Sequence, residues 1–435
     1  MREEATEIVR NIRAAGHEAL FNGGCVRDLL LGKEPKDIDI ATSATPDEIL
    51  ELYPKANTIG AHFGVVLVKS GDHYFEIATF REDGDYRDGR RPNSVRFSTA
   101  ERDAQRRDFT VNGMFLDPET EEVIDYVGGK ADLETRTLRA IGDPVARFEE
   151  DYLRMLRAVR FATVLEGFEI ESETRDALCR LSAKITEISA ERIREELDKI
   201  WLSPNRVSGF DLLADSGLMK AILPEILELR GCEQPPQWHP EGDVYVHTRI
   251  MLDLLEPDAS LPLVLSVLFH DIAKPATFSY DPDEDRIRFN GHDKLGAEMT
   301  RGILRRLRYS NEIVDAVCGG VERHMQFKDV QKMRTSKLKR FMARETFPDE
   351  LELHRVDCES SNGFTDNYDF LKEKEEEFAN EPLIPKPFLT GRDLVKRGWK
   401  PGPKFGKVLR EAQDLQLEGR LETRDQALDW LDDRI

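Results

Sequence analysis

The stretch NGGCVRDLLLGKEPKDIDI, residues 22–40, is the one around which the chain is organised. A glycine pair runs into a short apolar helix that carries Arg27, and a Gly-Lys-Glu-Pro turn leads to an alternating segment with Asp37 and Asp39. Side chains two apart on a strand share a face, so we expect the two carboxylates to project together. Carboxylates that close repel unless a cation lies between them, and Mg²⁺ holding a phosphate suits such oxygen ligands. The alternative for an Asp-x-Asp alone is a solvated strand end.

The composition is that of a soluble globular protein. The 435 residues, 40% hydrophobic and 34% charged, predict about two to four domains. A net charge of −21 excludes a uniformly basic surface but leaves room for local basic tracks along a nucleic acid. The five cysteines are scattered, which indicates reduced thiols. The N-terminus lacks a secretory signal and no apolar run is long enough to cross a bilayer, so we expect a cytoplasmic protein with no membrane contact.

The first third of the chain alternates helix and strand signals. Helical periodicity ends at Gly16, and a helix is expected from about Pro46 to Leu52. The apolar runs 62–68 and 73–80, joined by Ser-Gly-Asp, predict a hairpin that could add Glu76 to the acidic pair, although a surface glutamate is equally compatible.

After these runs the sequence predicts first a loop and then a long helical region. We interpret 81–97 as a loop whose Arg87, Arg90 and Arg91 could reach phosphates; a solvated loop is the alternative. From about residue 140 the pattern is helical, with no strands expected and a loop or hairpin at 278–296.

A second group of charged residues lies in EEDYLRMLR. On a helix, Asp151, Arg154 and Arg157 would share a face. An ordinary surface ion pair is the simpler interpretation. Beside a nucleotide, an Asp that accepts and an Arg that donates would match the donor–acceptor edge shared by cytosine and adenine and reject uracil and guanine.

These segments together resemble one protein family. GGCVRDLLLGKEPKDIDIAT, RRDFTVNGM, EDYLRMLRAVRFA and SAERIREEL, in this order, are similar to the class II tRNA nucleotidyltransferases and bacterial poly(A) polymerases. The resemblance implies an α+β fold: a mixed α/β head of the polymerase-β type, followed by an all-α neck, body and tail. It implies attack of an RNA 3′-hydroxyl on the α-phosphorus of CTP or ATP, with Mg²⁺ in the head.

The resemblance also assigns residues to roles. Asp37 and Asp39, with Glu76 as the candidate third carboxylate, would be catalytic and hold the metal. The implied nucleotide-binding residues are Gly23, Gly24, Arg27, Arg107, Asp108, Asp151, Arg154 and Arg157, of which Asp151 and Arg154 would be the amino-acid template for the base.

The family includes enzymes with different products. The segment 84–97 resembles a flexible element of members that add the terminal A, and 389–409 resembles the tail of CCA-adding members. Gly113 is a departure, because CCA-adding members more often have alanine there and poly(A) polymerases have glycine. We expect addition of CCA to tRNA, with poly(A) or A-only addition as the alternative.

A third group resembles the HD superfamily of metal-dependent phosphohydrolases. Its members, in the family's order, are His247, His270, Asp271, His292, His324 and Asp357. Imidazoles with carboxylates suit a divalent transition metal, or two bridged by the central Asp. A phosphohydrolase acting on nucleotides or cyclic phosphates is therefore the alternative from another class, and a non-catalytic RNA-binding protein is a third. The five other histidines, His239 and His354 among them, are given no role.

We expect four domains. They are a nucleotidyltransferase head (1–139), a helical neck for nucleotide and RNA binding (140–230), an HD-type domain (231–362) and a helical tail (363–435). The basic segments 301–308 and 332–344 are candidates to contact the phosphates of the tRNA acceptor and T arms.

Overall fold

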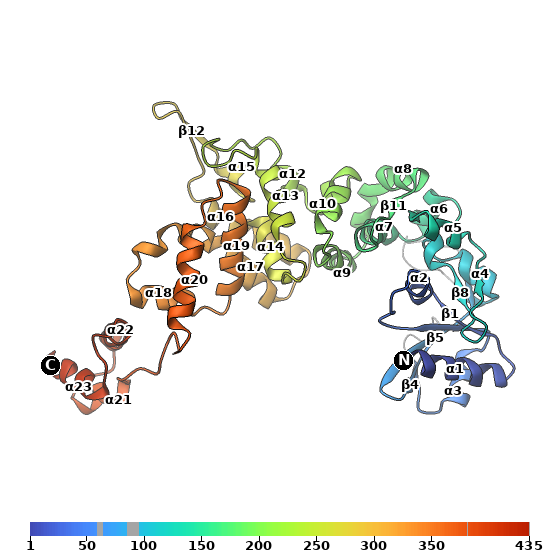
Figure 1. The fold of residues 1–435 in the computed structure, drawn as a ribbon, viewed down its shortest axis with the longest axis horizontal. Coiled ribbons are helices and arrows are strands. Elements are labelled where there is room, and N and C mark those ends of the chain that lie inside the picture. The colour runs from blue at the N-terminus through green and yellow to red at the C-terminus, as the bar shows by residue number, and fades with distance from the viewer. Residues whose placement is uncertain (59–63, 85–94, 381, 435) are drawn as a thin grey trace. The chain divides into compact units, whose positions relative to one another are not determined.

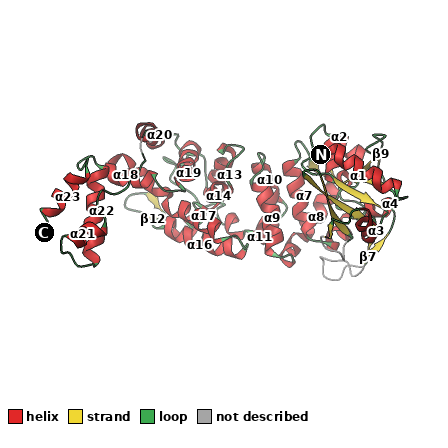
Figure 2. Cartoon of the chain, turned by 90° about the horizontal axis from the view of Figure 1, so that it is seen from below, coloured by secondary structure: helices red, strands yellow, loops and turns green. Residues whose placement is uncertain are grey.

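The computed structural model describes residues 1–58, 64–84, 95–380 and 382–434. The chain folds as two compact units, Met1–Pro224 and Glu225–Ile435 (Figure 1). Strands gather in the first unit, whereas the second is almost wholly helical (Figure 2). The expected α+β class, with a mixed α/β head and a helical remainder, is confirmed. Within the described ranges no helix combines the length and apolar character that a membrane span requires.

A seven-stranded sheet forms the centre of the head. Its order is β3-β4-β5-β2-β1-β8-β9, and β2 runs parallel to β5 while the other neighbours are antiparallel. The strands are β1 (Ala19–Asn22), β2 (Asp39–Thr42), β3 (Asn57–Thr58), β4 (Val65–Ser70), β5 (His73–Thr79), β8 (Phe115–Leu116) and β9 (Val123–Ile124). The helices beside them are α1 (Arg2–Ala14), α2 (Gly24–Leu30), α3 (Pro46–Leu52), α4 (Ala100–Gln105) and α5 (Gly129–Glu134).

The placement of Asp37 on a strand was wrong. Strand β2 begins at Asp39, which pairs with Asn22, the last residue of β1. Beyond Asn22 the chain turns at Gly23, whose φ of +72° is readily adopted by glycine, and enters α2. Residue 37 therefore has no partner in β1, and Asp37 lies exposed just ahead of the strand.

The predicted hairpin is present and brings Glu76 toward the acidic pair. Strands β4 and β5 pair from Val65 with Ala78 to Ser70 with His73. Strand β5 also pairs in parallel with β2, Ile40 opposite Ile77, and continuing this register sets Asp39 beside Glu76. Ile77 is buried and Glu76 is exposed, as expected for a strand with one face in the core.

The loop expected at 81–97 has strands at its ends. β6 (Arg81–Asp83) and β7 (Val95–Phe97) form an antiparallel pair. Cross-strand hydrogen bonds thus order both ends of a segment that has no apolar period. The arginines predicted to reach phosphates, Arg87, Arg90 and Arg91, lie outside the described residues.

The rest of the first unit is a helical array. It contains α6 (Pro144–Glu150), α7 (Leu153–Val164), α8 (Ser172–Leu181), α9 (Ala190–Trp201), α10 (Arg206–Asp215) and α11 (Leu218–Ile222), with α12 (Pro224–Leu227) at the boundary. The expectation of no strands was wrong at one place, because β11 (Glu169–Ile170) pairs in parallel with β10 (Thr137–Leu138). Buried Leu156 and Trp201 belong to the apolar faces of α7 and α9, two helices that pack together.

The second unit surrounds an almost entirely buried helix. This is α14 (Leu261–Phe269), which starts at the Ser260 cap and leads directly into His270. It packs against α13 (Val244–Leu254), α17 (Asn311–Arg323) and α19 (Phe347–Ser360). The unit also contains α15 (Lys274–Thr277), α16 (His292–Arg306), α18 (Thr335–Met342) and α20 (Asp366–Phe378), with the hairpin β12 (Ser279–Asp281) and β13 (Arg286–Arg288). The helices α21 (Gly391–Lys396), α22 (Pro403–Leu417) and α23 (Arg424–Asp432) have an apolar cluster of their own, which includes Leu394 and Leu431.

Candidate nucleotide and metal sites

A cavity of about 570 Å³ in the first unit gathers the head residues. It is lined by Gly23, Gly24, Arg27, Asp37, Asp39, Arg107, Asp108, Asp151, Arg154 and Arg157, all of them candidates from the sequence. Arg106 also lines it, one of the two arginines before Asp108 to which the family resemblance assigns the ribose and phosphates. The lining residues that were not predicted are Asn112, Leu153, Arg160, Phe161 and Arg192. Seven arginines therefore face one cavity together with four aspartates, and a polyanion is the ligand that such a wall favours.

The acidic cluster has the electrostatics of a cation site. Burial, together with the negative charges of Asp37 and Glu76, raises the pKa of Asp39 from 3.8 to about 6, although Arg107 opposes the shift. Carboxylates that disfavour one another's ionisation in this way are relieved by a bound cation. The donor set is made of oxygen alone, which fits Mg²⁺.

The glycine turn and Arg27 form one wall of the cavity. The Arg27 guanidinium is buried, with Nη1 donating to Asn112 Oδ1 at 2.5 Å and Nε to Asp28 Oδ1 at 2.9 Å. A Cβ on Gly23 would come within 3.2 Å of Arg107 Nη1. Because Gly23 and Gly24 have no side chains, Arg107 and Arg27 can lie close to the backbone of the turn in the cavity wall.

A buried carboxylate holds the two arginines of RRDFT in place. Asp103 accepts from Nη2 of Arg106 at 2.6 Å through one oxygen and from Nη2 of Arg107 at 2.8 Å through the other. Burial would raise the pKa of Asp103, but the charges of Arg107 and Arg106 outweigh it and the pKa is lowered. Asp103 therefore stays ionised and orients both side chains from behind.

Asp108 joins this segment to helix α7. It accepts from Nε and Nη2 of Arg157 at 2.8 and 2.6 Å, and from Asn112 Nδ2 at 3.2 Å. Burial opposes ionisation, yet Arg157 lowers the pKa of Asp108 to about 2. This two-point pair fixes the segment at 108–112 against the helix that carries Arg154.

The expected helical face of Asp151, Arg154 and Arg157 was wrong in its geometry. Asp151 has an extended backbone between α6 and α7, and its carboxylate accepts from the Leu153 N–H at the start of α7. Nη2 of Arg192, on α9, donates to Asp151 Oδ2 at 2.6 Å, while Arg154 pairs with Glu150. The cavity nevertheless receives all three predicted side chains.

The unpredicted residues had sequence signals of different strength. Arg192 lies in SAERIREEL and Asn112 in RRDFTVNGM, two segments that carry the family resemblance. Arg160, in RAVRFA, pairs with buried Glu196 of α9. This pairing spans two helices, so no local spacing predicts it.

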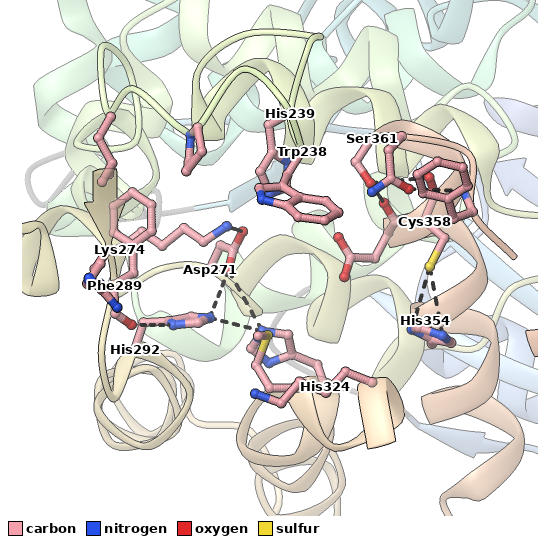
Figure 3. A pocket seen from close by; sticks show the side chains of 18 of the residues that line it. Trp238, His239, Asp271, Lys274, Phe289, His292, His324, His354, Cys358 and Ser361 are labelled. Atoms are coloured by element: carbon pink, nitrogen blue, oxygen red, sulfur yellow. Dashed lines mark hydrogen bonds and ion pairs between the residues drawn. The ribbon is translucent and has the colours of Figure 1, made fainter. Parts of the chain in front are cut away.

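A second site occupies the second unit (Figure 3). A cavity of about 650 Å³ is lined by Asp271, His292, His324 and Asp357, with Trp238, His239, Lys274 and His354 also in its wall. His247 and His270 lie buried behind it, where Nε2 of His247 is 3.1 Å from Asp357 Oδ1 and Nε2 of His270 is 3.0 Å from Asp271 Oδ2. All six residues of the predicted histidine–aspartate group are thus brought together.

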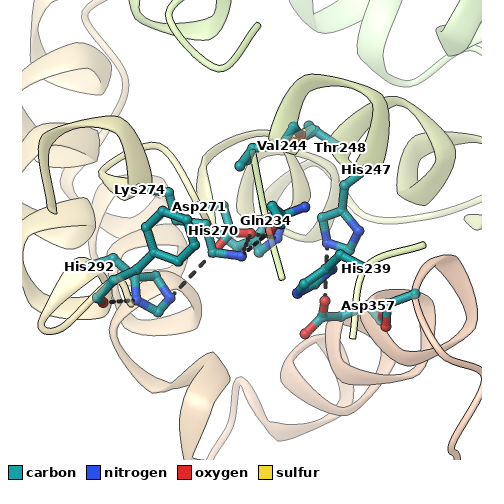
Figure 4. Close-up of polar contacts among 12 residues, drawn as sticks. Gln234, His239, Val244, His247, Thr248, His270, Asp271, Lys274, His292 and Asp357 are labelled. Carbon is teal, nitrogen blue, oxygen red and sulfur yellow. Dashed lines mark hydrogen bonds and ion pairs between the residues drawn. The ribbon is translucent and has the colours of Figure 1, made fainter. Parts of the chain in front are cut away.

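Five of the six residues form two possible metal-binding sets that share Asp271, and Asp357 belongs to neither. His247, His270 and Asp271, labelled in Figure 4, are close enough to hold one ion. Asp271, His292 and His324 are close enough to hold another, and His239, Glu241 and His247 form a further set beside them. Both oxygens of Asp271, and Nε2 of His247 and of His270, are buried and lack a well-formed hydrogen bond within the described chain. Buried polar atoms in that state fit a cation between them.

Charge in this site is balanced locally. Burial would raise the pKa of Asp271, but His270 and Lys274, whose Nζ is 2.5 Å away, lower it well below its usual range. Burial lowers the pKa of His324 to about 4. Burial would also lower the pKa of His247, yet the carboxylates of Asp357 and Glu241, which face its two ring nitrogens, raise it to about 9. A bound cation would therefore displace a proton there.

Two histidines left without a role also lie at this cavity. His239 Nδ1 is 2.9 Å from Glu241 Oε1, and the ring of His354 stacks on that of Phe327 at 4.8 Å. The HPEGDVYVHT stretch contains His239, Glu241 and His247 within nine residues, and this spacing was the signal available for the first two.

Three family models match the chain in order. The poly A polymerase head domain matches residues 19–139, the probable RNA and SrmB-binding site of polymerase A matches 167–229, and the HD domain matches 243–353. Fold and sites therefore define a polymerase-type nucleotidyltransferase head followed by an HD-type helical unit.

Comparisons that cover the whole chain identify its family more closely. The chain is 32% identical over 436 residues to the CCA-adding enzyme of Lactobacillus helveticus, covering 99% of this chain and 96% of that protein. It is 43% identical over 227 residues to the CCA-adding enzyme of Geobacillus thermodenitrificans, where the match spans about half of either protein, 52% of this chain and 55% of the relative. The crystal structure of Bacillus stearothermophilus CCA-adding enzyme in complex with CTP has a TM-score of 0.77 at 25% identity, covering 99% and 97% of the two chains. The chain belongs to the CCA-adding enzyme family.

The raised pKa of Asp39 predicts a pH-dependent stability. The folded pKa of about 6 lies above the ordinary 3.8, so this carboxyl favours folding below pH 4 and loses that contribution as the pH rises through 6. In a chelating buffer, Asp39→Asn should raise the free energy of unfolding by about 1–3 kcal/mol at pH 8 and change little at pH 4. Scanning calorimetry at both pH values measures this. Asp72→Asn, at the exposed β4–β5 turn, is the control. An equal effect of Asp39→Asn at both pH values would show that the ionised Asp39 carboxylate is not destabilised by its burial and its acidic neighbours.

Proposed function

We propose that this protein adds the 3′-terminal CCA to tRNA from CTP and ATP without a nucleic-acid template. The observation that supports it most directly is a single cavity in which an acidic pair, a wall of arginines and Asp151 face one another. Membership of the CCA-adding enzyme family supports the same activity.

In the proposed reaction the RNA 3′-oxygen attacks the α-phosphorus of the bound nucleotide. A new O–P bond forms, the bond between the α-phosphorus and the bridging oxygen breaks, pyrophosphate leaves and the hydroxyl proton passes to solvent. Mg²⁺ held by Asp37 and Asp39, with Glu76 beside them, would neutralise the phosphates and make the hydroxyl a better nucleophile.

The chain's own side chains orient the triphosphate. We assign phosphate contacts to Arg27, Arg107 and the backbone of Gly23 and Gly24. Arg157, joined to Asp108, is assigned to the ribose side. Because Asp28, Asn112 and Asp103 already hold the arginines, little side-chain entropy remains to be lost when the nucleotide binds.

Asp151 and Arg154 are assigned to base selection. Arg192 and the Leu153 N–H hold the Asp151 carboxylate, which can still accept from the amino group of cytosine or adenine. Arg154 offers donors to the neighbouring ring nitrogen. Uracil and guanine present the reverse order and would leave like groups facing each other.

Gly113 does not favour a poly(A) polymerase. A Cβ at this position would lie 2.8 Å from Val127 Cγ2 and 3.1 Å from Ile141 Cδ1, so neighbours fill the space that an alanine needs. Local packing therefore explains the glycine. This removes the main sequence argument for the alternative product.

The RNA partner is assigned to basic segments of the second unit. Several arginines there are engaged with carboxylates: Arg306 with Glu225, Arg340 with Asp414 and Arg344 with Glu350. Exposed Arg334 and Lys337 are the better candidates for phosphates of the acceptor and T arms.

Nucleotide incorporation tests the activity. Full-length protein should extend tRNAs ending at the discriminator base and at C with labelled CTP, and a tRNA ending in CC with labelled ATP. Asp39→Ala should slow each step about 10³-fold or more, because it removes a ligand of the metal ion that would stabilise the negative charge developing on the phosphates. Asp72→Asn is the control. Unlimited ATP addition to a CC end would favour poly(A) synthesis instead, and full activity of Asp39→Ala would contradict the site.

Base selection is tested separately. Asp151→Ala should weaken discrimination of CTP over UTP and of ATP over GTP by about 1–3 kcal/mol, roughly 10- to 100-fold, because the acceptor for the amino group is lost. Ratios of kcat/KM for the four nucleotides measure it, with tRNA binding as a second readout that should change little. Asp176→Ala, on the exposed side of α8, is the matched control. Unchanged ratios would refute the assignment.

We propose a second activity, metal-dependent phosphohydrolysis, for the histidine–aspartate site. It is supported by buried carboxylate and imidazole atoms that lack a hydrogen-bond partner among the described residues. The residues that carry them form two sets that share Asp271. A divalent transition metal would supply a nucleophilic water and polarise the phosphate. Lys274 balances the charge of Asp271 at Oδ2, the oxygen that also faces His270. Nucleotides or cyclic phosphates are the proposed substrates.

Substitution of Asp271 should abolish this second activity and leave nucleotide addition in the head intact. With Mn²⁺ or Co²⁺, phosphate release from nucleotides or opening of cyclic phosphates should fall about 10³-fold or more in Asp271→Ala, because the shared ligand is lost. CCA addition should persist in that variant. Equal hydrolysis by wild type and variant, or none by either, would remove the second proposal and leave the first intact.

A further inference from the structure

Three of the four histidines in the two metal-binding sets are oriented in the same way. Nδ1 of His270 lies 2.8 Å from the Val267 carbonyl, Nδ1 of His292 lies 2.7 Å from that of Phe289, and Nδ1 of His324 lies 2.6 Å from that of Val321. Each carbonyl is three residues earlier in the chain. A carbonyl can only accept, so Nδ1 carries the proton and Nε2 keeps the lone pair that binds a metal.

The fourth histidine, His247, has no such carbonyl contact among the described hydrogen bonds. Its Nδ1 is 2.7 Å from Oε1 of Glu241, while its Nε2 faces Asp357. Ser360 Oγ is also near Nδ1, at the longer distance of 3.3 Å. A side-chain oxygen thus occupies the position that main-chain carbonyls occupy for the other three.

Glu241 is placed to serve this purpose. Its side chain is only 7% exposed, and the same Oε1 lies 2.9 Å from Nδ1 of His239 in the cavity wall. Its second oxygen is buried without a hydrogen bond within the described chain. One carboxylate therefore meets two imidazoles, one behind the cavity and one in its wall.

We propose that Glu241 is a positioning residue of the histidine–aspartate centre, which fixes His247 in the tautomer that leaves Nε2 for the cation. The inference rests on the proposed metal binding of this centre. His239, Glu241 and His247 also lie close enough to hold an ion. We assign Glu241 and His239 to the support of His247 and not to the ligands of the cation.

A pair of substitutions separates tautomer control from simple charge. Glu241→Leu removes the acceptor, whereas Glu241→Gln keeps an oxygen that can accept from Nδ1 just as the backbone carbonyls do. Control of the His247 tautomer therefore predicts weaker metal binding in the first variant and unchanged metal binding in the second. A role of the negative charge alone predicts loss in both.

The readout is Co²⁺ affinity, followed by the visible absorption of the imidazole-bound ion. The full chain carries Asp39→Ala throughout, so that the head's acidic cluster does not bind the probe. Glu241→Leu should weaken Co²⁺ binding about 10- to 100-fold, and Glu241→Gln should stay within roughly threefold of the parent. Glu233→Leu, at an exposed position, is the control, and His239→Gln should leave the affinity unchanged. Glu241→Ala replaces the leucine variant should that one fail to fold.

The outcomes distinguish this inference from the proposal beneath it. If the parent binds no Co²⁺, or Asp271→Ala binds it equally well, the metal centre itself is refuted. If binding is lost in Asp271→Ala but kept in Glu241→Leu, the centre stands and the role of Glu241 is overturned. Equal loss in the leucine and glutamine variants would also overturn tautomer control, as would a loss in His239→Gln equal to that in Glu241→Leu.

Discussion

Repulsion among guanidinium groups is the constraint on which the head depends. Seven arginines around one cavity cannot be packed unless each has a counter-charge, because an unpaired buried charge is very costly. The structure supplies one for each: Arg27 pairs with Asp28, Arg106 and Arg107 with Asp103, Arg154 with Glu150, Arg157 with Asp108, Arg160 with Glu196 and Arg192 with Asp151. Four of these pairs join residues no more than four positions apart. The other three are long-range: Arg157 joins α7 to Asp108, Arg160 joins α7 to α9, and Arg192 joins α9 to Asp151 just ahead of α7. The arginines of the cavity therefore also hold together the elements that carry them.

Sequence reasoning succeeded where a local pattern determines the geometry. The glycine turn into α2 and the β4–β5 hairpin were predicted, because backbone freedom and side-chain alternation are properties of a few adjacent residues. Most of the residues that line the cavity were candidates from the sequence, largely through the family resemblance, whereas others such as Arg160 were not predicted. It failed where a partner lies far along the chain. Strand β2 is short because β1 turns away at Gly23, and Asp151 leaves the helix because its side chain caps the next one. The pairing of Asp108 with Arg157, across 49 positions, likewise needs the folded chain.

The histidine–aspartate site shows the same division. The order of its six residues predicted the cluster, since the residue types themselves are the ligands. Glu241 was missed because its spacing from His239 and His247 does not show that its carboxylate lies against Nδ1 of His247. The sequence shows which side chains can bind a metal, whereas the orientation of those side chains depends on contacts that form only in the folded chain. The division of the two compact units into four domains likewise stays a prediction.

The two sites differ in the chemistry of their donors, and this difference determines how one chain can serve two metals. The head offers carboxylate oxygens only, and an all-oxygen set suits the hard Mg²⁺ ion that also retains phosphate and water ligands. The second unit offers four imidazoles around Asp271, nitrogen donors that later transition metals prefer. Raw affinity does not separate the two, because a transition metal binds most donor sets more tightly than Mg²⁺ does. In the proposed reaction, selectivity in the head would come from abundance, because an exchangeable Mg²⁺ would enter with each nucleotide. In the second unit it would come from the imidazoles, three of which are oriented by main-chain carbonyls and the fourth by Glu241.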